Sequence, residues 1–453
     1  MSNMRTVTIG FVIGLIVVGI GGYYVGRTLT WSDAYQKGYD IGYEEGVGAA
    51  PAPMFPKGTV KIGCELPLTG SFSRGGHEGL QGAQLAVEEV NEAGGVAGYK
   101  VEIVTADVEE LEAGTVTRAL ENLILKENVA AILTNWPTSS QFELDLVAKY
   151  DQIYMYCGES QMTEQIVSPN PENYPTVFNI NPSYKPGQTA IREILGILVE
   201  EGELILPNKK VFIITSDCSY SRYFSEANRE DFIEHGYEVV GYEMVPFGSV
   251  TEWGPILEKI RANDPGLIVN HDWIPTNNIL FIEQFLERPT KSWIALNYAP
   301  STREFIDALG EKGNGVLSID NIMLTTHVTD WYRAQELSEK FYDKWGYYPG
   351  PEGARLQCMV HIWADGVNKH GDPFDQLGVA KAMMEITHYD CEGGTVEFDP
   401  TTHTSKPMQS CSAQLWDGVV RHFRCYDAGP DYNTRLTEYE DWELREPPWF
   451  EEA

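Results

Sequence analysis

The sequence is poor in positive charge and lacks the short motifs of several enzyme classes. Lysine and arginine number 33 against 66 aspartates and glutamates, so the formal net charge is −33. Such a surface repels nucleic acid and gives no reason to expect adhesion to anionic lipid. There is no GxxxxGK[ST] phosphate loop and no GxSxG nucleophile elbow. The sequence therefore predicts neither an enzyme nor a nucleic-acid-binding protein.

Metal-ligating side chains are also sparse and scattered. The closest pairings, Cys358 with His361 and His388 with Cys391, have a spacing of three residues but no second pair to complete a site. None of the seven cysteines forms a CxxC pair, and their odd number requires at least one free thiol. We therefore expect no metal and no cofactor.

The two last cysteines flank a predicted hairpin. The sequence SAQLWDGVVRHFR between Cys411 and Cys425 is typical of two strands that turn at Asp417-Gly418. In a regular two-residue hairpin, Cys411 lies opposite Arg424, and Cys425 faces the other side of the sheet. Without a bulge, the two thiols are not expected to form a disulfide.

Only one hydrophobic run is long enough to cross a bilayer. Val7–Val25 is 19 residues without a charge, bounded by Arg5 and Arg27. A secretory signal is the alternative, but a signal ends in small residues at a cleavage site, and this run leads into GGYYVGR. We expect an uncleaved transmembrane anchor over residues 1–28.

A stalk or linker is expected over residues 29–57. Tyrosines recur every four residues in SDAYQKGYDIGYEEGVG, and so do glycines, which on a helix gives one aromatic and one small stripe. Self-association through residues 32–48 and a flexible tether both fit this pattern. The prolines of AAPAPMFPKG (49–58) predict an irregular linker.

From Thr59 onward, apolar strand-like runs alternate with helical patterns. TVKIGCELP, KVEIVTADV, VAAIL and DQIYMYC read as strands, with helical periodicity between them. The alternation restarts after FNINPSYKPGQ with a helix and the strands KVFIITSD, YEVVGYEMV, GLIVNHDW and SWIALNY. Alternating strands and helices predict parallel sheets with helices on both faces, so we expect an α/β protein of two doubly wound, Rossmann-like units.

Residues 59–107 resemble a known family. The stretch VKIGCELPLTGSFSRGGHEGLQGAQLAVEEVNEAGGVAGYK is similar to the start of extracellular solute-binding proteins of the branched-chain amino acid and amide group, with their strand, PLTG, Gly-rich loop and GxxLAVEEIN pattern. FIITSDCSYSR and GTVEFDPTTHTSKP match the same family further on. The resemblance covers about residues 59–425.

The resemblance implies a periplasmic-binding type I fold, in which two lobes joined by a hinge close on a ligand. Lobe 1 is expected over 58–181 and about 320–385, and lobe 2 over 182–319 and about 386–453. It also implies an extracytoplasmic location, at the cell surface or in the periplasm, and the permease and ATPase subunits of an ABC importer as partners.

Candidate ligand-binding residues follow from the loops at strand ends, because ligands of open α/β sheets bind beyond the carboxyl ends of the strands. In LTNWPTSSQFELDLV three hydroxyls separate a strand from a helix, which suits either helix capping or an anion site at the helix N-terminus. The resemblance places ligand contacts there and in the matching loops. The candidates are Arg74, Thr138, Ser139, Ser140, Glu159, Ser160, Gln161, Tyr220, Trp273 and Asn297.

Two positions depart from the pattern of members that bind amino acids. Asn297 stands where those members place an acid for the ligand's ammonium group, and Arg74 stands where an aromatic residue often covers the ligand. An asparagine cannot balance a buried positive charge, although Glu159 and Asp272 could substitute. The sequence favours a neutral amide, urea or carboxylate over a zwitterion.

The function expected from these features is a membrane-anchored solute receptor that hands a small polar organic molecule to an ABC importer. The alternative is a structural or sensory protein of the cell surface that keeps the fold as a scaffold and assembles through its Tyr/Gly stalk.

Overall fold

The computed structural model describes residues 55–70, 72–138, 140–182, 199, 202–320, 334–391, 394–406, 409–427, 435–438 and 443–453. The chain divides into two units, Met1–Met54 and Phe55–Ala453. The predicted anchor, the stalk up to residue 54, Ser139 and most of the predicted helix over 189–202 lie outside the described residues. Among the residues that are described, no helix is both long enough and apolar enough to cross a membrane.

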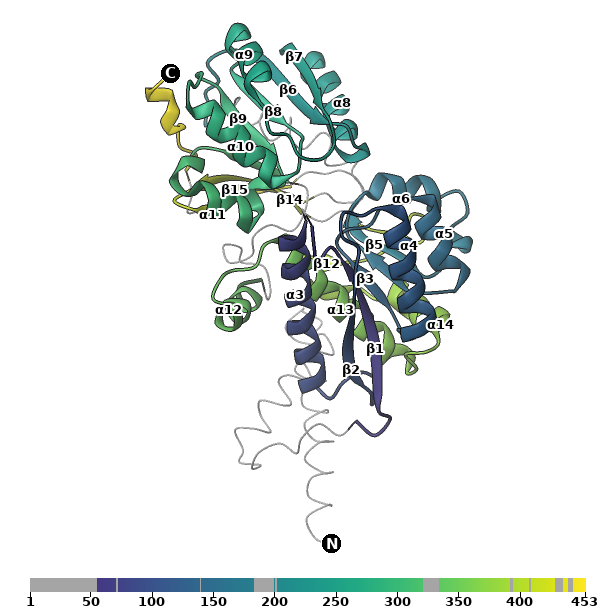
Figure 1. The fold of residues 1–453 in the computed structure, drawn as a ribbon. Coiled ribbons are helices and arrows are strands. Elements are labelled where there is room, and N and C mark those ends of the chain that lie inside the picture. Colours follow the sequence, from purple (N-terminus) through teal and green to yellow (C-terminus); the bar gives the residue numbers. More distant parts are fainter. Residues whose placement is uncertain are drawn as a thin grey trace. The chain divides into compact units, whose positions relative to one another are not determined.

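Two sheets with helices on their faces form the second unit (Figure 1). We call the first sheet with its helices lobe 1. Its six strands pair in the order β13-β5-β4-β3-β1-β2, and all neighbours are parallel. The strands are β1 (Thr59–Leu66), β2 (Lys100–Asp107), β3 (Ile132–Thr134), β4 (Tyr154–Tyr156), β5 (Val177–Pro182) and β13 (Thr404–Ser405). The helices are α3 (Ser73–Glu92), α4 (Ala113–Asn122), α5 (Gln141–Lys149), α6 (Ser160–Val167), α12 (Ala334–Trp345), α13 (Pro351–His370) and α14 (Gln376–Met384).

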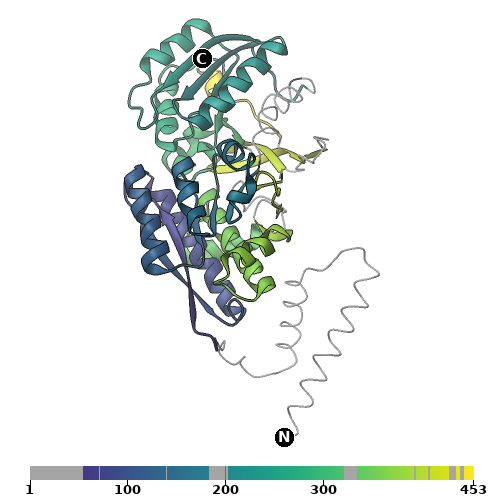
Figure 2. The same cartoon turned by 90° about the vertical axis from the view of Figure 1, so that its right-hand side faces the viewer.

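The second sheet has eight strands in the order β16-β15-β14-β10-β9-β8-β6-β7, and with its helices it forms lobe 2 (Figure 2). Strands β6 to β10 pair in parallel, whereas β14 to β16 add an antiparallel extension. The strands are β6 (Lys210–Ser216), β7 (Glu238–Val245), β8 (Leu267–Asn270), β9 (Trp293–Asn297), β10 (Leu317–Asp320), β14 (Gln409–Trp416), β15 (Val419–Asp427) and β16 (Arg435–Glu438). The helices are α8 (Ser219–Glu234), α9 (Gly254–Asn263), α10 (Pro275–Leu286) and α11 (Arg303–Leu309); a two-stranded ladder pairs β11 (His388–Cys391) with β12 (Gly394–Val396).

The central strands are apolar because helices cover both faces of each sheet. Strand β8 is buried along its whole length, and so is β9. Sheet membership shows that the chain passes between the lobes three times: between β5 and β6, between β10 and α12, and between β13 and β14. The predicted α/β architecture with two doubly wound lobes is thereby confirmed.

Helix α3 begins eight residues earlier than its apolar pattern predicted. The sequence SRGGHEG reads as a Gly-rich loop, yet it forms the first turns of this helix. Its glycines permit close packing: a β-carbon on Gly76 would lie 2.0 Å from the Pro67 carbonyl oxygen, and one on Gly82 would lie 1.8 Å from the Gly353 oxygen. Packing against α13 therefore outweighs the low helix propensity of glycine, about 1 kcal/mol per residue.

Strands β5 and β13 were not predicted. Asn179, Asn181 and Pro182 in β5 break the apolar pattern by which a buried strand is recognised. Strand β13 pairs with β5. Thr404–Ser405 thus belongs to lobe 1, within a segment that the sequence analysis assigned to lobe 2; the other lobe boundaries stay predictions.

The terminal hairpin turns at Asp417-Gly418, as predicted. Both residues have positive φ, 53° and 70°, as a type I′ turn requires. The predicted register was wrong, however, because a bulge shifts the pairing between Ser412 and Ala413 and brings Cys411 opposite Cys425.

Four of the other cysteines can be assigned as free thiols or as disulfide-bonded. Cys64, Cys157 and Cys218 are free, in agreement with the odd cysteine count. Cys358 is disulfide-bonded. Because three cysteines with described side chains are free thiols, its partner lies among those whose side chains are not described.

Candidate functional site

The turn with three hydroxyls binds a carboxyl group of its own helix. Thr138 donates a hydrogen bond to Glu143, and the Thr138 and Ser140 hydroxyl oxygens lie 2.7 Å apart. Glu143 also accepts hydrogen bonds from the backbone N–H groups of Thr138 and Ser140. It occupies the N3 position of α5 and so makes one half of a capping box, while the Ser140 side chain makes no cap hydrogen bond.

Glu143 belongs to a buried hydrogen-bonded chain. The Tyr154 hydroxyl donates to Glu143 and lies 3.1 Å from Glu65 Oε2. A phenol has only one hydrogen, so one of the two carboxyl groups near the Tyr154 oxygen must be protonated for both hydrogen bonds to form at once. Burial, reinforced by the charge of Glu143, raises the pKa of Glu65 well above its ordinary value. The Thr138 hydroxyl and the N–H groups of Thr138 and Ser140 are therefore used by the fold.

Glu159 links the two lobes. It precedes α6 with a left-handed backbone (φ 41°). Its carboxylate accepts hydrogen bonds from the Ser219 hydroxyl and the Tyr220 N–H at the start of α8, while burial raises its pKa to about 7. Ser160 is fully buried, and its hydroxyl has no hydrogen-bond partner among the described residues. Gln161 is half-buried in the first turn of α6.

Three polar residues at strand ends of lobe 2 lie together. Asn297 Nδ2 donates to the Tyr220 hydroxyl over 3.4 Å. The Asn297 side chain also faces His271, and burial lowers the pKa of that imidazole to about 3, so it is neutral. Asp272 accepts hydrogen bonds from Asn277 Nδ2, at 2.7 Å, and from the Ile274 N–H. Both partners belong to its own lobe.

An aromatic cluster joins the lobes beside these residues. Phe72 and Trp136 of lobe 1 have ring centroids 5.0 Å apart, and Trp273 of lobe 2 lies 5.8 Å from the first and 5.6 Å from the second. Phe247 and Tyr298 extend it, with centroids 6.1 and 6.2 Å from Trp273. The predicted site residue Trp273 is thus the centre of a ring cluster that spans both lobes.

A cavity of about 280 Å³ opens next to this cluster. It is bounded by both lobes: by the start of α3, Trp136 and the start of α13 on one side, and by the loops after β7, β8 and β9 on the other. Arg74 lines it, and its guanidinium is ion-paired at 2.6 Å with Asp307 of lobe 2. Of the predicted residues that the structure describes, only Arg74 borders this cavity.

Two buried glutamates form the inner wall of the cavity. Tyr298 donates a hydrogen bond to Glu352 from a backbone with φ 57° and ψ −53°, which is uncommon for a residue other than glycine. Arg355 Nη1 lies 3.2 Å from the same carboxylate oxygen, Oε1, while Oε2 is buried without a hydrogen-bond partner among the described residues. Glu78 accepts from the N–H groups of Gly353 and Gly350, and burial together with the charge of Glu352 raises its pKa to about 7.

The sequence analysis did not single out these two glutamates. Glu78 stands in the stretch that reads as a Gly-rich loop, and Glu352 stands at the start of a helix with an otherwise ordinary pattern. Trp136 stands inside LTNWPTSS, beside the hydroxyls that drew the prediction. Trp136 could have been predicted as a site residue because it follows a buried strand closely.

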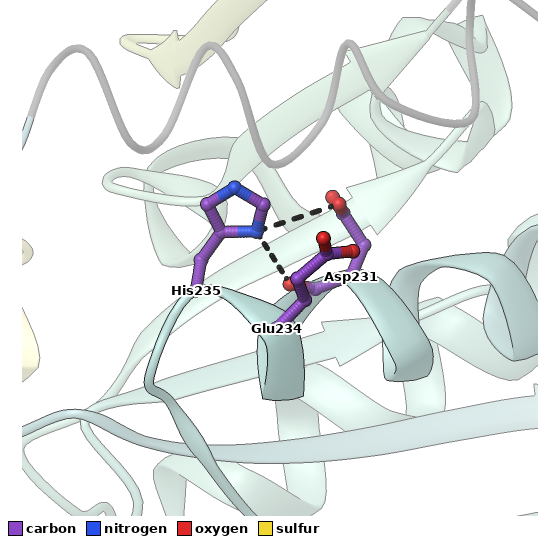
Figure 3. Close-up of side chains that lie close together, drawn as sticks. All are labelled: Asp231, Glu234 and His235. Carbon is purple, nitrogen blue, oxygen red and sulfur yellow. Dashed lines mark hydrogen bonds and ion pairs between the residues drawn. The ribbon is translucent and has the colours of Figure 1, made fainter.

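One cluster of metal-ligating side chains occurs in the described part of the chain. Asp231, Glu234 and His235 come together at the end of α8 (Figure 3). His235 Nδ1 lies 2.9 Å from the Asp231 carbonyl oxygen and 3.6 Å from its carboxylate. These are contacts that an imidazole makes at a helix C-terminus, about 20 Å along α8 from Tyr220, and they are unrelated to the cavity.

The loops of two α/β lobes thus enclose a cavity at the carboxyl ends of their strands, and comparison with known proteins agrees with this architecture. A model of the periplasmic binding protein family matches residues 59–416. The chain belongs to this family. Among curated relatives, it is 23% identical over 354 residues to the Leu/Ile/Val-binding protein homolog 7 of Brucella abortus (strain 2308), covering 77% of this chain and 84% of the other.

Solved structures of the periplasmic binding protein class share the fold. A Silicibacter pomeroyi protein assigned to branched-chain amino acid ABC transport is 25% identical, with a TM-score of 0.73 and coverage of 86% of this chain and 100% of the other. The substrate-binding protein LivJ of Streptococcus pneumoniae, in complex with isoleucine, is 19% identical with a TM-score of 0.67, covering 84% and 100%. A solute-binding protein of R. palustris in complex with benzoate is 16% identical with a TM-score of 0.68, covering 84% and 98%. These relatives are binding components of transporters, not enzymes.

Proposed function

We propose that this periplasmic binding protein is the substrate-binding component of an ABC importer and closes around a small polar organic solute between its lobes. The supporting observation is that two buried polar atoms of cavity-lining residues, Glu352 Oε2 and Trp136 Nε1, have no hydrogen-bond partner among the described residues. A buried polar atom without a hydrogen bond costs about 1–3 kcal/mol. A bound solute that supplies the missing partners removes this cost.

Closure is the mechanical part of the proposal. Glu159 bonds to the start of α8, and Tyr298 bonds to Glu352, so polar contacts from one lobe to the other bracket the aromatic cluster. These contacts exist only when the lobes approach each other, and a solute that binds both lobes shifts the population toward that state. The importer's permease and ATPase subunits are the partners that the proposal requires.

The solute classes indicated by the sequence are an amino acid, an amide or urea, and a carboxylate. Among the relatives, one structure contains isoleucine and another contains benzoate. We include all of these classes in the test of binding, because the chain departs from the family pattern at Arg74, which lines the cavity, and at Asn297.

Membrane attachment through Val7–Val25 is the second component of the proposal. Its support is the uncharged length of that segment and the linker that follows it. The full chain is expected to sediment with membranes, and proteolysis within the linker at 49–58 is expected to release the second unit. Recovery of the uncut chain in the soluble fraction would contradict the anchor.

Thermal unfolding of the full chain tests the receptor function. A ligand at 100 times its Kd stabilises the folded state by about 2.7 kcal/mol, which is a measurable shift in Tm. The panel contains amino acids, amides, urea, carboxylates and small organic cations. A rise in Tm with one chemical class supports the proposal. If no compound of the panel changed the Tm, the scaffold alternative with its assembly through residues 32–48 would be favoured.

A further inference from the structure

The cavity between the lobes has an excess of acidic side chains. Its lining includes four glutamates and two arginines, namely Glu78, Glu110, Glu304, Glu352, Arg74 and Arg303. Both arginines bind the same carboxylate, Asp307, at 2.6 Å. Their positive charge is therefore partly balanced before any ligand enters.

The inner wall brings two carboxyl groups together where water is excluded. Glu78 and Glu352 are 7% and 5% exposed. Arg355 is the cation paired with Glu352, at 3.2 Å, and it does not line the cavity. Burial raises the pKa of both carboxyl groups, to about 7 for Glu78, so an adjacent cation would favour their ionised forms. Glu352 Oε2 has no hydrogen-bond partner among the described residues. Buried charge of one sign is costly unless it is paired.

Aromatic rings supply the other walls. Phe72, Trp136, Phe247 and Tyr298 all line the cavity. The face of an aromatic ring attracts a cation by about 0.5–2 kcal/mol, depending on how well water is excluded. The Trp136 indole N–H is buried and has no acceptor among the described residues. A ligand oxygen could accept its hydrogen bond.

We propose that the solute bound in this cavity is a compact organic cation that also carries a hydrogen-bond acceptor. Its positive group lies between the aromatic rings and the carboxylates of Glu352 and Glu78, and its acceptor receives the Trp136 indole N–H. This inference rests on the proposed receptor function and names the ligand class of the same cavity. An anionic ligand would add to the negative charge, and the cavity volume of about 280 Å³ restricts the ligand to a small molecule.

A pair of isosteric probes isolates the charge. Choline and 3,3-dimethylbutan-1-ol have the same shape and hydroxyl group, but the first carries a quaternary nitrogen where the second has carbon. We expect choline or the smaller cation ethanolamine to raise the Tm of the full chain and to change its tryptophan fluorescence. The neutral alcohol should bind at least about tenfold more weakly than choline, because it lacks the cation–π and carboxylate attraction.

Two variants assign the effect to the cavity. Glu352→Gln should weaken cation binding by about tenfold or more, because one tenfold step equals 1.4 kcal/mol, and should leave binding of the neutral alcohol unchanged. Glu78→Gln provides the same test should the first variant fail to fold. The matched control is Glu127→Gln, which removes a carboxylate paired with Lys61 at 2.8 Å outside the cavity.

The outcomes separate the two proposals. Stabilisation by a carboxylate, an amide or a neutral amino acid, with none by the cations, would overturn the ligand class and leave the receptor function intact. Equal affinity for choline and its neutral isostere would also overturn it. No stabilisation by any compound would contradict both proposals.

Discussion

Glu143 and Glu352 are both buried glutamates in the first turn of a lobe 1 helix, yet their surroundings differ. Glu143 accepts hydrogen bonds from the Thr138 hydroxyl, the Tyr154 hydroxyl and two backbone N–H groups. Glu352 uses one oxygen for Tyr298 and Arg355, and the Asn135 side chain lies beside the carboxyl group. Its other oxygen makes no hydrogen bond of ordinary length among the described residues. The first carboxyl group completes the fold, whereas the second can accept a bond from a ligand.

The difference shows how a binding group can be distinguished from a structural one. Position in the first turn of a helix and burial are common to both, so neither property decides. The number of hydrogen bonds already made within the chain does decide, because a fully bonded carboxyl group gains little from a ligand. Four changes test this distinction, and they follow from the largest expected effect to the smallest.

Replacing Glu143 tests the structural member of the pair. Glu143→Ala removes the acceptor of the Thr138 hydroxyl and of two backbone N–H groups, together with one of the two acceptors near the buried Tyr154 hydroxyl, so the free energy of unfolding should fall by about 3 kcal/mol. Urea denaturation measures this change. Glu127→Ala is the control, since its partner Lys61 has a side chain that is 43% exposed. A loss below 1 kcal/mol for Glu143→Ala would show that Glu143 does not hold the Thr138–Ser140 turn.

Neutralising Glu78 tests the charge on the binding side through pH. Burial, with repulsion from Glu352, raises the pKa of Glu78 from 4.5 to about 7. As pH rises from about 4.5 to 7, the unfolded chain releases this proton while the folded chain retains it, so the folded state loses stability. Glu78→Gln removes this contribution.

The variant and the parent should be similar in stability near pH 4.5, and at pH 8 the variant should be more stable by about 3 kcal/mol. Denaturation at both pH values, without ligand, measures the difference. Parallel pH profiles for the two proteins would show that Glu78 is not held protonated.

Adding a methyl group tests the shape of the cavity while leaving its charges in place. A β-carbon on Gly75 would lie 2.8 Å from Trp136 Cζ2 and 3.5 Å from Glu352 Cγ. Gly75→Ala should weaken ligand binding by about tenfold, whereas its stability should change little because alanine gains about 1 kcal/mol of helix propensity. Titration of the best ligand and urea denaturation separate the two effects.

Gly114→Ala in α4 is the matched control, since its β-carbon would meet only the Arg118 side chain, at 3.5 Å. It should stabilise the protein and leave binding unchanged. If Gly75→Ala bound as tightly as the parent, Trp136 would not be a wall of the ligand cavity.

Removing Arg74 should have the smallest effect. Its side chain is 49% exposed and that of Asp307 is 40% exposed, so their ion pair should contribute less than about 1 kcal/mol. Arg74→Ala should leave cation binding unchanged or slightly stronger, as measured by titration. Complete loss of binding would instead assign Arg74 a direct ligand contact, as the sequence predicted.

Much of the fold could be predicted from the sequence because central strands of parallel sheets are continuous apolar runs. Strand β1 was expected over 59–67 and spans Thr59–Leu66; α13 was expected over 352–369 and spans Pro351–His370. Strand β5 was missed because its asparagines and proline contradict strand composition. The start of α3 was missed because its glycines are explained only by packing against α13.

The candidate site was predictable only in part. Topology places loops at the carboxyl ends of the strands, and Tyr220, Asn297, Glu159 and Trp273 do lie at contacts within or between the lobes there. Glu78 and Glu352 are 274 positions apart in the chain and start from helices rather than from strand-end loops. Their proximity depends on how α3 packs on α13, which no local pattern encodes.

The last passage of the chain between the sheets is short, and this sets the mechanics of opening. Ser405 ends β13 in the first sheet, and Gln409 begins β14 in the second. Four residue steps reach at most about 14 Å when fully extended. This short connection, one of three between the lobes, keeps the ends of β13 and β14 close in every arrangement of the lobes. Opening should therefore separate β2 and β7 the most, because they are the edge strands farthest from β13 and β14 in the order of their sheets.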